Sequence, residues 1–194
     1  MTIEQEIKNQ YAKLFKEEDW RPFKIMADYY FKTAANLKKK DIEIHEYIKL
    51  MGRNIQKRLY LGIGAELLLK SLYLKNNYCI NKVKRGVKNP GKPKKYFDVS
   101  IEDYDERDTY TLGSLIDNLK EIIECDSNLL KGLKIAKVFR NKEGHVATLW
   151  HSYKEENYSD IEYSIKEVYK KGFGETLKFQ ISFEEDEKAI FEIE

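Results

Sequence analysis

The chain has 194 residues, of which 42% are hydrophobic and 35% charged, a composition that favours a soluble globular protein with a heavily charged surface. The length permits one domain with a real core or two small ones, and no apolar run of about 18 residues is present, so we expect no membrane association. The net charge of +2 says little about partners, and the acidic start MTIEQE predicts no secretory signal.

The two cysteines, Cys79 and Cys125, match neither a metal-ligand spacing nor a disulfide framework. A reducing, cytoplasmic setting without a bound metal or other cofactor is therefore expected.

Apolar residues at helical spacing predict a helix over about 3–15 and a second over 22–37, with Pro22 in its first turn. A long helical run over 43–77 follows, which we expect to loosen near Gly52. Gly62 and Gly64 weaken this helix by about 1 kcal/mol each relative to alanine, so they predict close backbone packing there.

Residues 78–110 are expected to form an irregular insertion rich in glycine, proline and charge, and insertions of this length are commonly functional. The segment 81–95 holds seven basic residues and no acid, which is suited either to RNA phosphates or to solvent. The seven basic residues are Lys82, Lys84, Arg85, Lys88, Lys92, Lys94 and Lys95.

Further helices are predicted over 111–124, from a cap at Ser127 to about Phe139, and from a capping box at Ser159 to a stop at Gly172. Alternating apolar residues from Leu177 predict a terminal β-hairpin. The expected architecture is all-α: an up-and-down helical bundle over residues 1–172 with the basic insertion, followed by a hairpin tail over 173–194.

Three histidines are present, and they differ in their surroundings. His45 lies at a helix start, where a solvated role is expected, and His151 follows a tryptophan, which favours packing. His145 comes five residues after Arg140 and directly after Gly144, and Asn141 directly follows Arg140. Residues five apart lie about 140° apart around a regular helix. Arg140 and His145 are therefore expected to reach one phosphate only if the helix breaks between them. Gly144 favours such a break, and a break after Phe139 would let Arg140 leave one helix end while His145 begins the next.

The segment Arg140-Asn141-Lys142-Glu143-Gly144-His145 resembles the R-x-x-x-x-H motif of the HEPN superfamily. The segment 64–72, with its acid and lysine amid leucines, resembles the central helix of these domains, and 110–119 resembles the helix that precedes the motif. The resemblance covers about residues 25–170.

The resemblance implies a metal-independent ribonuclease in which Arg140 stabilises the phosphate, His145 moves protons, and Asn141 orients either the histidine or the phosphate. It also implies a homodimer whose two motifs face each other, RNA as substrate, a 2′,3′-cyclic phosphate product, and a toxin, stress-response or phage-defence setting with an antitoxin or regulator as a possible partner. The alternative is a HEPN-like module that binds a protein or nucleotide without catalysis. Ala147 stands where one toxin class carries a modified tyrosine, which disfavours that class.

Glu66 and Lys70 lie one helical turn apart. They either support Arg140 or form an ordinary surface ion pair, and the sequence leaves both interpretations open.

Overall fold

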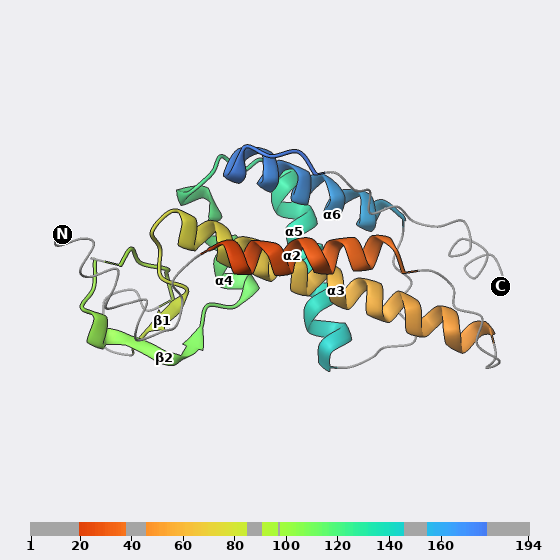
Figure 1. Ribbon diagram of the computed structural model, residues 1–194, viewed down its shortest axis with the longest axis horizontal. Coiled ribbons are helices and arrows are strands. Elements are labelled where there is room, and N and C mark those ends of the chain that lie inside the picture. The colour runs from red at the N-terminus through yellow and green to blue at the C-terminus, as the bar shows by residue number, and fades with distance from the viewer. Residues whose placement is uncertain (1–19, 38–45, 85–90, 97, 146–154, 178–194) are drawn as a thin grey trace.

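The computed structural model describes residues 20–37, 46–84, 91–96, 98–145 and 155–177, and within these it is predominantly helical, as expected. Helix α2 (Arg21–Ala35) lies along α3 (Glu46–Lys75), and α5 (Ser127–His145) crosses them (Figure 1). Helix α6 (Glu155–Val168) packs on α5. No described helix has the length and apolarity needed to cross a bilayer.

The core lies where these four helices meet. Phe31 of α2, Leu68 and Leu72 of α3, Phe139 of α5 and Ile165 of α6 are all fully buried in one apolar cluster. Burial of each such side chain contributes about 1.5–3 kcal/mol. The helix patterns that predicted α2, α3 and α5 come from these buried faces.

Two of the helix contacts depend on glycine, as the sequence predicted. A Cβ atom on Gly62 would lie 2.5 Å from the Cβ of Arg140 and 2.6 Å from its backbone nitrogen. A Cβ atom on Gly64 would lie 2.6 Å from the ring of Phe31. Helix α3 therefore packs closely against α5 at Gly62 and against α2 at Gly64. A larger residue at either position would increase the distance between the two helices.

The predicted loosening near Gly52 is wrong, because α3 is continuous through this position. The cost of one glycine, about 1 kcal/mol, is smaller than the packing energy of a helix that other elements cover on several sides.

The N-terminal half of α3 also contains buried cations. The ammonium of Lys57 lies 5.5 Å from the centre of the Tyr158 ring of α6.

The insertion is more regular than predicted. Strands β1 (Asn81–Val83) and β2 (Tyr104–Thr109) pair antiparallel, with a register irregularity between Asn81 and Val83, and a short 3-10 turn, η1 (Ile101–Asp103), precedes β2. This ribbon lies at one end of the molecule (Figure 1). It has a small core of its own, which explains its order: Cys79, Val83, Tyr96 and Tyr104.

Several predicted helix boundaries are wrong, beginning with those of α4 and α5. Helix α4 (Leu112–Asp117) stops before the predicted end and is followed by the 3-10 turn η2 (Leu119–Glu121). At this C-cap the Asn118 side chain donates back to the Ser114 carbonyl. Asp126, not Ser127, caps α5: its carboxylate accepts the Leu129 N–H at 2.7 Å, which lowers the pKa of Asp126.

The capping box predicted at Ser159 is also wrong, since α6 already begins at Glu155. Beyond Val168 the chain continues as a π-helical turn, η3 (Tyr169–Phe173), through the predicted stop at Gly172. Gly174, at φ 69°, provides the left-handed end instead. The predicted helix over 3–15 and the hairpin strands over 178–194 lie outside the described residues.

We expect Gly62→Ala to lower the free energy of unfolding by about 2 kcal/mol, because the new methyl group overlaps the backbone of α5. Gly52→Ala is the matched control in the same helix: a Cβ there meets nothing within 4 Å, so it should raise stability by up to about 1 kcal/mol. Urea denaturation of both variants measures the difference, and equal effects would contradict the close α3–α5 contact.

Candidate functional site

Helix α5 is continuous from Ser127 to His145, so the predicted break between Arg140 and His145 is wrong. Gly144 lies within the last helical turn and does not interrupt it. The two positions therefore project about 140° apart around the axis. Asn141 and position 145 are one turn apart and share a face, whereas Arg140 projects toward α3.

Arg140 is fixed on two sides. Its backbone lies against Gly62 of α3, and its Nε donates to Oε2 of Glu66 at 2.7 Å. Glu66 is one turn beyond Gly62 on the same face of α3, so the helix crossing itself sets the position of the carboxylate beneath the arginine.

Glu66 also binds Lys70, and both side chains are mostly buried, at 13% and 12% exposed, so they do not form the ordinary surface ion pair that the sequence left open. Its Oε1 lies 3.0 Å from the Lys70 ammonium, while Oε2 holds Arg140. Lys70 in turn donates to the hydroxyl of Thr109, at the end of β2, at 3.1 Å. The pair is thus part of a chain of contacts from α5 through α3 to the ribbon.

The ion pair leaves a defined part of the guanidinium available. Nε contacts Glu66, and the two terminal nitrogens of Arg140 have no partner among the described residues. The Arg140 side chain is 39% exposed, against 13% for Glu66. A guanidinium held by one edge can offer its remaining N–H groups to an oxyanion such as phosphate.

The histidine of the predicted motif is described only in part. His145 is the last residue of α5, and its side chain lies outside what the structure describes, as do His45 and His151. Asn141 is exposed on the face of α5 that leads to position 145. Within the described residues, no group of three or more His, Cys, Asp or Glu side chains is placed to hold a metal ion.

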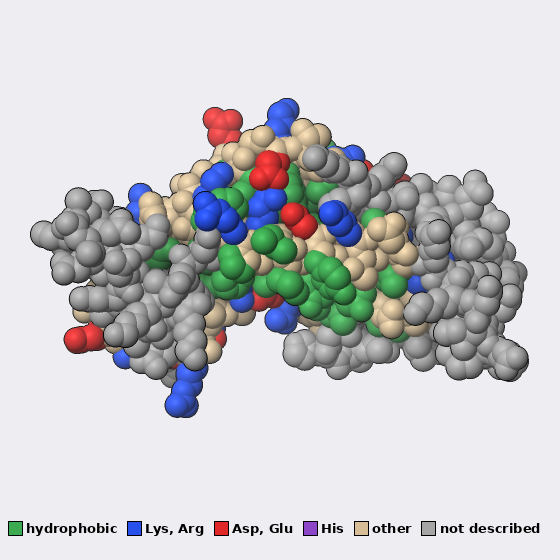
Figure 2. Space-filling model, viewed as in Figure 1, with side chains coloured by type: hydrophobic (Ala, Val, Ile, Leu, Met, Phe, Trp, Pro, Cys, Tyr) green, Lys and Arg blue, Asp and Glu red, His purple; other side chains and the backbone are tan. Residues whose placement is uncertain are grey.

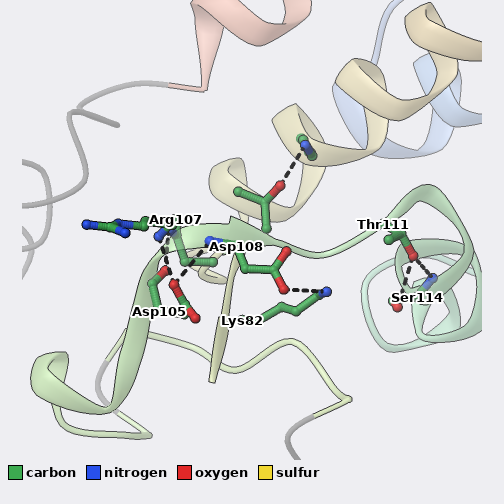
Figure 3. A network of polar contacts seen from close by, with 9 residues as sticks. Lys82, Asp105, Arg107, Asp108, Thr111 and Ser114 are labelled. Atoms are coloured by element: carbon green, nitrogen blue, oxygen red, sulfur yellow. Dashed lines mark hydrogen bonds and ion pairs between the residues drawn. The ribbon is translucent and has the colours of Figure 1, made fainter. Parts of the chain in front are cut away.

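The basic residues of the insertion largely have partners within the fold. Lys82 forms an ion pair with Asp108 at 2.7 Å (Figure 3), and Lys92 pairs with Glu121 at 2.5 Å, a contact that raises the pKa of Lys92. Lys84 donates to the Glu102 carbonyl. Lys95 lies over the ring of Tyr78, at 5.7 Å. Arg85 and Lys88 lie outside the described residues, and Lys94 is half-buried.

Tyrosine hydroxyls hold the backbone of the same segment. Tyr104 donates to the Lys95 carbonyl and Tyr110 to the Lys92 carbonyl, each at 2.9 Å. In β2, Asp105 accepts the Arg107 N–H at 2.8 Å (Figure 3), which lowers the pKa of Asp105. The described part of the insertion is therefore held by hydrogen bonds and by ion pairs, one internal and one to η2, and it differs from the open lysine loop that the sequence suggested.

The sequence reasoning overlooked the lysines of α5. From Ser127 to Lys142 this helix carries five basic residues and no acid, a charge pattern that the sequence already contains.

Comparisons with protein-family models, curated proteins and solved structures find no match.

A double-mutant cycle between Glu66→Gln and Arg140→Gln should give a coupling energy of about 1 kcal/mol in the free energy of unfolding, because the carboxylate is mostly buried and the arginine is partly exposed. Chemical denaturation of the two single variants and the double variant measures it. A coupling indistinguishable from zero would mean that the Glu66–Arg140 contact does not hold in solution.

Proposed function

We propose that this protein is a metal-independent endoribonuclease of the HEPN type, with Arg140 and His145 as its catalytic residues. The observation that carries the proposal is the anchored arginine: Glu66 holds Nε, and the terminal nitrogens remain available on the helix that ends at His145. Asn141, on the face shared with position 145, supports it as a residue that orients substrate or histidine.

The reaction uses a nucleophile from the RNA itself. A base removes the 2′-hydroxyl proton, the 2′-oxygen bonds to phosphorus, and the bond to the 5′-oxygen breaks as an acid protonates that oxygen. The products are a 2′,3′-cyclic phosphate and a 5′-hydroxyl. Negative charge grows on the phosphorus oxygens meanwhile, and the free guanidinium edge of Arg140 is suited to stabilise it.

The continuous helix favours a paired site. One imidazole cannot be both base and acid in a single step, and in one chain Arg140 and position 145 project from different sides of α5. A homodimer in which two motifs face each other supplies a second histidine. This arrangement follows from the resemblance to HEPN domains and from the helical geometry together.

The cellular setting that we propose is a toxin, stress-response or phage-defence system, in which an antitoxin or other regulator would restrain the activity.

A second candidate function, a HEPN-like binding or scaffold module, is favoured by one observation. Helix α2 carries three exposed apolar side chains on one face, Ile25 at 64%, Met26 at 44% and Tyr29 at 58%. Figure 2 shows hydrophobic side chains gathered along this helix.

Incubation of the protein with RNA in EDTA tests the proposal. Wild type should cleave, and His145→Ala and Arg140→Ala should each lose at least about 100-fold in rate, because each removes a proton-transfer or charge-stabilising group. Arg140→Lys keeps the charge but loses the fixed fork, so it should remain well below wild type. Cleavage that persists in both alanine variants, or that EDTA abolishes in wild type, would overturn the assignment.

A further inference from the structure

Helix α5 concentrates positive charge on the element that carries the motif. Lys131, Lys134, Lys137 and Arg140 recur every three residues, and no acid is present before Glu143. Two of the four cations have a carboxylate partner: Lys131 lies 2.7 Å from Asp160, and Arg140 lies 2.7 Å from Glu66. Lys134 and Lys137 have no ion pair or hydrogen bond among the described residues.

Lys134 lies on the same side of the helix as Asn141 and position 145, and Lys137 lies closer to the side of Arg140. Lys134, Asn141 and position 145 fall within a sector of about 40° around α5, over a rise of about 16 Å. Lys137 lies between that sector and Arg140. A molecule that contacts Asn141 and Arg140 would therefore meet Lys137 and then Lys134 as it continues toward the N-terminal end of α5.

The stem of Lys137 is seated against α4. A Cβ atom on Gly113 would lie 3.3 Å from Cδ of Lys137 and 3.6 Å from its Nζ, so a larger residue at position 113 would crowd this side chain. Lys134 is exposed, one helical turn further from the motif. The Lys137 side chain thus packs against α4, whereas the Lys134 side chain is exposed to solvent.

Like charges three residues apart on a helix repel each other by a few tenths of a kcal/mol. A face that served only solubility would mix the two signs of charge, as the insertion does where Lys82 pairs with Asp108 and Lys92 pairs with Glu121 of η2. Two neighbouring lysines that have no carboxylate partner among the described residues, next to the arginine that we propose to bind phosphate, are suited to a polyanion that continues past the reacting phosphate.

We propose that Lys134 and Lys137 bind the backbone phosphates of single-stranded RNA next to the phosphate held by Arg140, so that the substrate strand runs along α5. This rests on the proposed ribonuclease function and specifies its substrate-binding surface. It assigns strand binding to α5 in place of the insertion, whose described lysines are largely paired.

Binding of a fluorescein-labelled single-stranded RNA, measured by anisotropy over a range of salt, tests the proposal. His145→Ala serves as the background, so that the RNA stays intact. Adding Lys134→Gln/Lys137→Gln should lower the slope of log affinity against log salt by about 1.4, because two phosphate contacts on a single strand are lost. Over a tenfold decrease in salt, the background protein then gains about 25-fold more affinity than the variant does.

The matched control is Lys131→Gln/Lys166→Gln in the same background, which removes the same charge from two lysines that already pair with Asp160 and Glu162. It should leave the slope within about 0.3 of the background value. Lys134→Arg/Lys137→Arg should also bind normally. Thermal melts by circular dichroism confirm that each variant is folded.

The outcomes separate the two proposals. Loss of RNA binding in the Lys134/Lys137 variant alone supports the α5 surface, even if the protein with His145 intact proves unable to cleave RNA. An equal loss in the control variant, no loss in either, or no binding by the background protein would overturn the α5 surface. RNA cleavage that continues at the wild-type rate in Lys134→Gln/Lys137→Gln would overturn it while leaving the ribonuclease function in place.

Discussion

The close contact of α3 with α5 at Gly62 is the constraint on which the candidate site depends. Because position 62 has no side chain, the backbone of Arg140 lies directly on α3, and the arginine reaches Glu66 one turn further along the same helix. A bulkier residue would separate the two helices and with them the carboxylate from the guanidinium. Packing therefore decides the placement of Arg140, and the ion pair then decides which of its nitrogens remain available.

The continuous α5 changes how the motif can be used. A helix that broke after Phe139 would have brought both residues of the motif to one phosphate within a single chain. With α5 helical to His145, Arg140 faces α3 and position 145 projects about 140° away, alongside Asn141. This geometry agrees with the proposed use of two chains at one site. It also gives α5 an uninterrupted outer face, on which Lys134 and Lys137 extend the proposed contact with the strand.

The sequence predicted what depends on local periodicity and missed what depends on contacts between distant segments. Apolar residues at helical spacing predicted α2, α3 and α5, and the two nearby glycines predicted the close helix contacts at Gly62 and Gly64. The ribbon was missed because its core joins Cys79 to Tyr104 across the insertion, a pairing without local periodicity. At the early end of α4 the Asn118 side chain donates to the Ser114 carbonyl, and α6, which begins before the predicted capping box, packs on α5. The partners of Lys82 and Lys92 come from β2 and η2, so composition alone could not show that their charges are compensated.

In the proposed reaction, Arg140 and His145 cleave RNA by using its own 2′-hydroxyl. A cleavage assay in EDTA can compare an RNA that the protein cuts with the same RNA carrying a single 2′-O-methyl group at the nucleotide 5′ to the cut. We expect the unmodified RNA to yield a fragment ending in a 2′,3′-cyclic phosphate, seen by mass spectrometry, and the modified bond to stay intact. Cleavage of the methylated bond, or a product that never carries the cyclic phosphate, would contradict the proposed reaction.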